Sequence, residues 1–127
     1  MRAALLPALS DPDPAVVLAA LEGMGATVQV ADLVGLTAHT DPDVIVEALA
    51  RLRRLDAACA SQTARVMLDH TAWQVRLEAV RSLDINQCAC SAALLERRAR
   101  ERDELVREAI ERVLSSAPPM GRSGREA

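Results

Sequence analysis

Apolar residues recur along this chain in one frame that appears four times. Each copy places apolar residues at positions i, i+4, i+5 and i+8, and the residue at i+4 is always alanine. These positions share one face of an α-helix, so each copy predicts an amphipathic helix with a small residue at the centre of its buried face. The copies are Val16-x3-Ala20-Leu21-x2-Met24, Val44-x3-Ala48-Leu49-x2-Leu52, Val75-x3-Ala79-Val80-x2-Leu83 and Leu105-x3-Ala109-Ile110-x2-Val113.

The spacing of the four alanines indicates a structural repeat. They are 28, 31 and 30 residues apart, a period typical of stacked helical repeats. A second apolar segment precedes each frame, at residues 3–9, 28–38, 63–68 and 92–99. Two of the intervening turns, Asp11-Pro12-Asp13-Pro14 and Asp41-Pro42-Asp43, carry an N-cap aspartate and a proline suited to the first helical position. The predicted unit is therefore helix, tight turn, helix.

These units predict an all-α protein, a short α-solenoid of about four helix-pair repeats. The expected repeats are residues 1–25, 26–55, 56–86 and 87–114, which form one domain (1–114) followed by a disordered tail (115–127). Composition agrees, because Trp73 is the only aromatic residue and strands favour aromatic side chains. Between residues 91 and 114 the chain has no proline or glycine, so one long helix is an alternative to the last pair.

The first repeat resembles a known family. Its pattern Leu5-Leu6-x2-Leu9-x-Asp11-Pro12-Asp13-Pro14-x-Val16-x3-Ala20 is similar to the short HEAT-like repeat, the kind also found in phycobilisome lyase-type proteins. The Val-Arg pair of that family appears as Val75-Arg76 and, shifted by one residue, as Val106-Arg107. The resemblance covers residues 2–114, and it implies arginines that reach back toward the aspartate of an adjacent turn. Val17 and Ile45 replace this arginine in the first two repeats, and Thr71-Ala72-Trp73 replaces the third Asp-Pro turn.

Charge is unevenly distributed along the chain. The net charge is −3, but residues 1–50 carry one arginine against seven acidic residues, whereas residues 51–127 carry fourteen arginines against eleven. An acidic half argues against a nucleic-acid partner, for which a basic footprint is expected. The asymmetry also allows electrostatic steering of a charged partner.

The cysteines and the hydropathy bear on location. Three cysteines without framework spacing indicate free thiols in a reducing compartment, so we expect a cytoplasmic protein. The segment 3–9 is expected to be a helix rather than a signal sequence, and no apolar run is long enough to span a membrane. All fifteen basic residues are arginine, which we interpret as the coding bias of a GC-rich bacterium.

No catalytic, cofactor-binding or metal-binding residue is expected. Cys88-x-Cys90 supplies two of the four ligands that a tetrahedral zinc site needs, and no second motif accompanies it. His39 and His70 are expected in turns, and neither belongs to a His-Glu pair of the kind found in iron-dependent HEAT-repeat hydroxylases. Gly23-x-Gly25 follows a predicted helix and is interpreted as its C-terminal cap.

Three features are candidates for binding a partner protein. The first predicted helix has no charged face, and the second helices share an apolar row two residues before each alanine, with Arg107 at its end. Trp73 stands at the rim of a turn, and tryptophan is enriched among interface hot spots. The alternative for the first helix is a short, frayed terminus. For Trp73 it is packing over the joint between the second and third repeats, and for the apolar row it is burial. The candidate partner-binding residues are Leu5, Leu6, Leu9, Leu18, Val46, Trp73 and Leu77.

Charged residues beside these candidates are expected to face water. Glu47, Glu78 and Glu108 form an acidic row next to the apolar row. The last helix is expected to cap the C-terminal end with polar side chains, as stacked repeats require. Those side chains are Glu101, Glu104, Glu108, Glu111 and Arg112.

The sequence favours a non-enzymatic scaffold that binds another protein, with self-association through the first helix as one mode. No cofactor, nucleic acid or membrane partner is expected. Two alternatives remain open. The resemblance to HEAT-like proteins implies a bilin lyase or chaperone, and arginines near Trp73 could imitate the HEAT-like DNA glycosylases. Those arginines are Arg51, Arg53, Arg54, Arg76 and Arg81.

Overall fold

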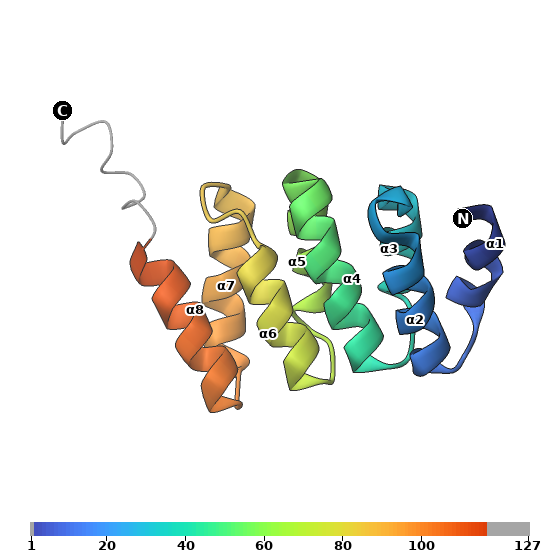
Figure 1. Cartoon of the computed structure of the whole chain (residues 1–127). Coiled ribbons are helices and arrows are strands. Elements are labelled where there is room, and N and C mark those ends of the chain that lie inside the picture. The colour runs from blue at the N-terminus through green and yellow to red at the C-terminus, as the bar shows by residue number, and fades with distance from the viewer. Residues whose placement is uncertain (1, 117–127) are drawn as a thin grey trace.

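The computed structural model describes residues 2–116, and every regular element within this range is helical (Figure 1). The prediction of an all-α protein is thereby confirmed. The elements are α1 (Arg2–Leu5), η1 (Leu6–Ser10), α2 (Pro14–Met24), η2 (Gly25–Thr27), α3 (Val30–Leu36), α4 (Pro42–Leu55), α5 (Ala57–Met67), α6 (Trp73–Ser82), α7 (Cys88–Arg100) and α8 (Glu104–Ser116), where η denotes a 3-10 helix. Ser115 and Ser116 end α8, and the rest of the predicted tail lies outside the described residues.

Aspartates begin most of the long helices, as the turn sequences predict. Asp13 and Asp41 each accept a hydrogen bond from the backbone N–H two residues ahead, and a proline follows each of them. Asp103 caps α8 in the same way, accepting from the N–H groups of Leu105 and Val106. These bonds satisfy donors that a helix start leaves without a partner. By contrast, Ala72 precedes α6 and offers no side-chain cap.

The helices stand in a row that runs from the N-terminal to the C-terminal end (Figure 1). Helices α2, α4, α6 and α8 each pack against the next of the four. The intervening helices lie beside them, since α3 contacts α4, α5 contacts both α4 and α6, and α7 contacts α8. All of these contacts join helices that are close to one another along the chain.

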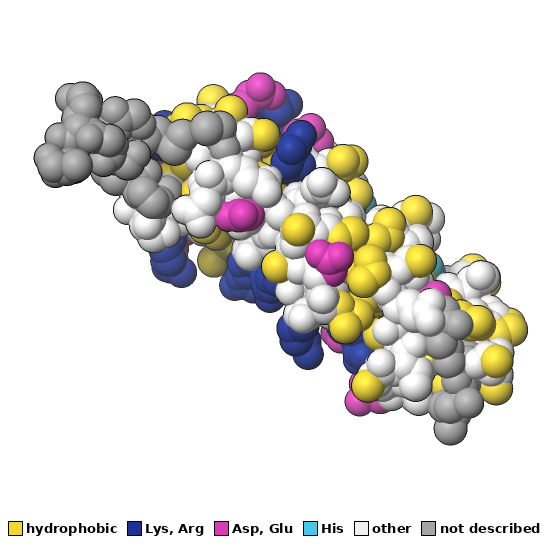
Figure 2. All heavy atoms as spheres, turned by 90° about the horizontal axis from the view of Figure 1, so that it is seen from above, with side chains coloured by type: hydrophobic (Ala, Val, Ile, Leu, Met, Phe, Trp, Pro, Cys, Tyr) yellow, Lys and Arg dark blue, Asp and Glu magenta, His cyan; other side chains and the backbone are white. Residues whose placement is uncertain are grey.

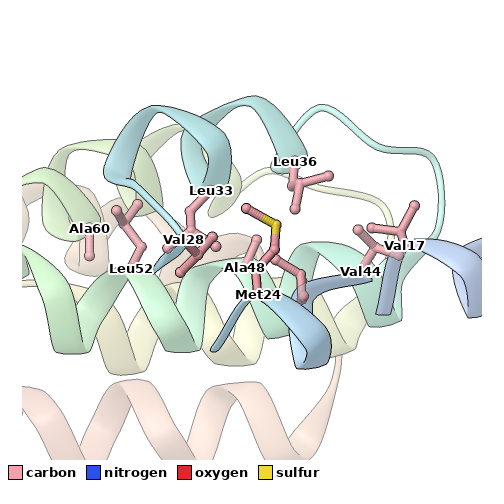
Figure 3. Packing of buried hydrophobic residues seen from close by; sticks show 10 residues of the cluster. Val17, Met24, Val28, Leu33, Leu36, Val44, Ala48, Leu52 and Ala60 are labelled. Carbon is pink, nitrogen blue, oxygen red and sulfur yellow. The ribbon is translucent and has the colours of Figure 1, made fainter. Parts of the chain in front are cut away.

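The core lies between these helices and consists of three clusters. The first joins α2, α3 and α4, where Met24 and Ala48 lie among larger aliphatic side chains such as Leu33 (Figure 3). A second cluster is formed by side chains of α5, α6, α7 and α8. A small third cluster places Ile45 and Leu49 of α4 against Val75 of α6. Three of the four predicted alanines, Ala20, Ala48 and Ala79, are buried.

The frame predicted for the fourth repeat begins one residue too early. Helix α7 ends at Arg100 and α8 begins at Glu104, so the alternative of one long helix is wrong. Counted from this start, the buried positions are Val106 and Ile110, while Leu105 is exposed and Ala109 only half-buried. The break sets the rotation of α8, and the apolar pattern alone does not reveal it.

A common numbering makes the four helices comparable. Position 1 is the first residue of each helix, namely Pro14, Pro42, Trp73 and Glu104. Position 3 is then valine in all four helices, and position 7 is the central small or aliphatic residue. Position 3 is occupied by Val16, Val44, Val75 and Val106, and position 7 by Ala20, Ala48, Ala79 and Ile110.

Candidate interaction surface

One hydrogen bond recurs in the turn before each helix of this row. The side chain three residues before position 1 accepts a hydrogen bond from the backbone N–H two residues further on. The acceptors are Asp11 (2.8 Å), His39 (3.0 Å), His70 (3.0 Å) and Glu101 (3.0 Å). His39 and His70 are therefore turn residues, as expected. Because Nδ1 accepts in both, the neutral ring carries its proton on Nε2, and in His39 that atom lies 3.4 Å from the carbonyl oxygen of Asp11.

Glu101 does not face water, contrary to the sequence-based prediction. It is 2% exposed and accepts both Nε–H and Nη2–H of Arg76, each at 2.9 Å. Arg97 donates from Nε at 3.1 Å, and the N–H of Asp103 completes four bonds to this carboxylate. Arg76 is also bonded to the carbonyl oxygen of His70 at 2.8 Å. This arginine therefore ties its own turn to the following one.

The surroundings of Glu101 shift its acidity. Burial raises the pKa of Glu101, but the hydrogen bonds from Arg76 and from the N–H of Asp103 oppose this effect. Together with the charges of Arg76 and Arg97, they hold the pKa below its ordinary value. The carboxylate is therefore ionised at neutral pH, and the cluster is a structural ion pair that joins two turns.

Arginines neutralise the predicted acidic row. Glu47 pairs with Arg51 at 2.7 Å, and Glu108 pairs with Arg112 at 2.9 Å. Glu78 is buried rather than solvated, and its partner is Arg53 of the preceding helix in the row, α4, at 3.2 Å. Figure 2 shows arginine side chains gathered along one long edge of the row, with acidic side chains among them.

The same pairing affects the proposed nucleic-acid patch. Four of its five arginines face carboxylates: Arg51, Arg53 and Arg76 as described, and Arg81 with Glu78 at 3.9 Å. A cation that is already paired contributes less to phosphate binding than a free one, because its own carboxylate must first be displaced. The arrangement therefore does not favour this alternative.

The structure aligns the predicted apolar row but leaves little of it exposed. Leu18, Val46 and Leu77 all occupy position 5, and each is half-buried against a core cluster. The fourth member at this position is Glu108, so the prediction of Arg107 was off by one residue. Trp73 begins α6, as Pro14 and Pro42 begin α2 and α4, and it is 38% exposed.

The predicted N-terminal candidates are only partly exposed. Leu5, Leu6 and Leu9 are half-buried and pack against the first core cluster. Leu5 lies over Gly23 of α2, where an added Cβ would come within 2.9 Å of its Cδ1 atom. Gly23 therefore permits this close approach, whereas Gly25, with φ of 51°, caps the helix.

One exposed apolar side chain at this end is a residue that the sequence pattern assigned to the core. Val16 is 37% exposed, although Val44, Val75 and Val106 at the same position are each 0% exposed. Around it lies an uncharged hollow of about 400 Å³, which we call the N-terminal face. Its lining residues are Leu5, Ala8, Ala15, Val16, Ala19 and Ala20. The frame itself gave no signal of this exposure, because Val16 matches the buried valines in sequence.

A second hollow lies between η1 and α3. It has a volume of about 540 Å³, and apolar side chains such as Leu9 and Leu36 line it together with Asp11, Asp32 and His39. The side chains of Asp11 and His39 are the turn acceptors described above, and Asp32 accepts from the N–H of Gln29 at 2.9 Å. These polar groups are thus engaged in holding local structure.

The remaining sequence candidates give no metal or membrane site in the described part of the chain. Cys90 is buried with its Sγ 3.4 Å from Ser61 Oγ, and Cys59 is half-buried. Among the described side chains no group of three or more metal-ligating residues forms, and none of the described helices is long and apolar enough to cross a membrane. The side chain of Cys88 lies outside the description.

Comparisons with family models, with curated proteins and with solved structures gave no match, so the assignment of function rests on the geometry described above.

Proposed function

We propose that the chain is a non-enzymatic protein-interaction module, a short α-solenoid of four HEAT-like repeats whose N-terminal face receives a helix of a partner protein. The observation that carries this proposal is the contrast at position 3. Val44, Val75 and Val106 are buried, and their equivalent Val16 is 37% exposed. Among the four valines at position 3, Val16 is thus the one that the described residues leave exposed.

The internal interfaces indicate what kind of helix fits. Val75 packs against Ile45 and Leu49, which lie four residues apart on α4. A partner helix with two aliphatic side chains at this spacing would cover Val16 in the same way. Because Val16 is only 37% exposed, covering it contributes part of the about 1.5–3 kcal/mol that burying a fully exposed valine gives, and its neighbours on the face must supply the rest of the binding free energy.

The last described helix, α8, presents charged side chains at the equivalent outer positions. Arg107 and Glu111 of α8 occupy positions 4 and 8, where α4 presents Ile45 and Leu49. Both charged residues are exposed, and Glu111 pairs with Arg98 at 3.2 Å. A polar outer face is what the end of a stacked repeat array requires for solubility. The outer faces of α2 and α8 therefore differ, and the apolar face of α2 supports the proposal.

Affinity capture tests this proposal. The baits are the wild type, Val16→Glu and the matched control Val66→Glu, whose valine is 72% exposed on α5. We expect the wild type and Val66→Glu to retain the same proteins from the native cell extract. Val16→Glu should fail to retain them. Circular dichroism would establish that all three baits are equally helical. Retention of the same proteins by Val16→Glu would contradict the proposal.

The alternatives receive less support. No contact described above singles out a bilin site, and the arginines of the proposed nucleic-acid patch are mostly paired. A cytoplasmic location belongs to the proposal as well, supported by the odd number of cysteines.

A further inference from the structure

We infer that the hollow between η1 and α3 is a separate docking site, which receives a basic side chain, arginine or lysine, from a partner protein. The inference goes beyond the proposed function, because this hollow shares no lining residue with the N-terminal face. Its volume of about 540 Å³ lies within the range of about 300–1,000 Å³ that is typical of ligand-binding clefts. Its open wall, its apolar lining and the charge around it identify the occupant.

Gly35 leaves one wall of the hollow open. It lies in the last turn of α3, and a Cβ atom added there would have no neighbouring side chain or segment within 4 Å. The missing side chain therefore adds to the space in the hollow, whose apolar lining includes Leu9 and Leu36. Such a lining suits the methylene stem of arginine or lysine, which packs on apolar surface while its charged end stays near polar groups.

The charge around the hollow is negative, and this part of the chain does not balance it. Residues 3–50 contain neither arginine nor lysine. Asp11 lines the hollow, and further aspartates lie at the starts of α2 and α4, namely Asp13, Asp41 and Asp43. None of these four aspartates forms an ion pair with a described residue, whereas arginines neutralise the acidic row described above. The field at the hollow therefore attracts a cation.

Asp11 is placed to bind the cationic group. Among the described residues, its carboxylate accepts one hydrogen bond, from the N–H of Asp13 to Oδ1 at 2.8 Å, so Oδ2 can accept from a ligand. A guanidinium or ammonium group would form a charge-assisted hydrogen bond there. An uncharged occupant would remove water from this carboxylate without replacing it, and an anion would be repelled. The charge therefore selects a basic side chain over an aliphatic or acidic one.

An NMR titration with two isosteric probes tests the inference. The probes are N-acetyl-arginine methylamide and N-acetyl-citrulline methylamide, which differ in charge but hardly in shape. At constant neutral pH, the arginine probe should shift the signals of the Gly35 amide and the His39 ring, because both residues line the hollow. The ring of His70, which holds the same place in the turn before α6, should not shift. The citrulline probe should bind at least about tenfold more weakly.

Three variants locate the contact. Asp11→Asn keeps an oxygen that accepts from the N–H of Asp13 and removes only the charge, so it should weaken binding of the arginine probe at least about fivefold. Gly35→Leu should abolish binding, because a side chain then fills the hollow. Asp43→Asn is the matched control, since it removes one charge at an exposed position outside the hollow. It should bind like the wild type at physiological ionic strength, where distant exposed charges are screened.

Each other outcome overturns the inference. Equal binding of the two probes would show that charge does not select the occupant, and unchanged signals of Gly35 and His39 would show that the hollow receives no basic side chain. Undiminished binding by Gly35→Leu or Asp11→Asn would place the contact elsewhere. Binding of spermidine without binding of the arginine probe would assign the hollow to a small amine instead of a protein side chain. The proposed function fails separately, because its test is the retention of partner proteins by Val16→Glu.

Discussion

The first and last turns of the row solve one structural problem with different chemistry. Between α2 and α4, position 4 is the buried Val17, and His39 reaches directly to the carbonyl oxygen of Asp11. Between α6 and α8, position 4 is Arg76, which binds Glu101 and the carbonyl oxygen of His70. Asp11 and His70 hold the same place in their turns, so both solutions satisfy an equivalent carbonyl group.

This difference shows that the fold prescribes contacts between turns rather than particular residues. An apolar side chain with a histidine makes the connection without a buried charge. An arginine with a glutamate makes it with two hydrogen bonds between them, and Arg97 and a backbone N–H supply two more to the same carboxylate, at the cost of removing both charges from water. The middle connection, between α4 and α6, also uses an apolar residue with a histidine: Ile45 at position 4 of α4 and His70 in the turn before α6. The N-terminal turns should therefore tolerate changes that the last turn does not.

Substitution of Arg76 by leucine should have the largest effect on stability. It would leave Glu101 buried with Arg97 and one backbone N–H, and removal of one partner of a buried pair costs about 3–5 kcal/mol. The loss would be measured as the free energy of unfolding in urea. Val17→Leu, at the same position of α2, should cost less than half as much.

The double variant Arg76→Ile with Glu101→His sharpens the comparison. It copies the residues of the turn before α6, where Ile45 and His70 take these places. Because both members of the charged pair are removed together, most of the stability lost in Arg76→Leu should return. A double variant as unstable as Arg76→Leu would mean that the two chemistries are not interchangeable.

Enlarging the central alanines should have the next largest effect. Ala48→Leu and Ala79→Leu are each expected to destabilise by roughly 1–3 kcal/mol, because both sites are fully buried and closely packed. The control is Ala109→Leu, which the apolar pattern treats as equivalent although Ala109 is half-buried. Thermal unfolding should show a clear decrease for the first two and little change for Ala109→Leu. Equal decreases for all three would contradict the corrected frame of α8.

The frame of α8 illustrates how far the sequence carries. Apolar periodicity and the Asp-Pro turns suffice to predict helix pairs, the alanine contacts and the starts of α2 and α4. In the last repeat, Leu105, Ala109 and Val113 fit a helical face as well as Val106 and Ile110 do. Only the cap at Asp103 fixes the start of the helix, and that bond depends on the turn around Glu101.

The candidate site was harder to predict for a related reason. Val16 and Val44 have the same place in the pattern, and they differ only in whether another helix covers them. Sequence patterns report which face of a helix is apolar but not whether another helix covers that face. Glu101 was likewise expected at the surface, because its partner Arg76 lies 25 residues away along the chain. Such long-range pairing leaves no local signal.

Acid should weaken the last turn before the first. The pKa of Glu101 is lower in the native state than in the unfolded chain, so the native state binds fewer protons between the two pKa values. This carboxylate therefore stabilises the fold above the ordinary glutamate pKa of 4.5. That contribution is lost as the pH falls through the lowered native value. The excess stability of the wild type over Glu101→Gln should therefore be largest near neutral pH and shrink in acid. The exposed control Glu104→Gln should show no such change; a constant difference for Glu101→Gln would count against the ion pair.

The smallest expected effect is a gain in stability at the one turn of the row that lacks a cap. Ala72 has backbone angles of −84° and 128°, close to the −87° and 125° of Asp41, which caps α4. Ala72→Asp should therefore accept a hydrogen bond from the N–H of Gln74, as Asp41 does from Asp43, and the new charge would lie at the positive end of α6. Removing an N-cap costs about 1 kcal/mol, so we expect a gain of about 0.5–1 kcal/mol in the free energy of unfolding. Asp41→Ala is the reciprocal variant and should lose a similar amount. If Ala72→Asp is less stable than the wild type, the half-buried methyl group of Ala72, which packs beside Ile45 and Val75, matters more than the missing cap.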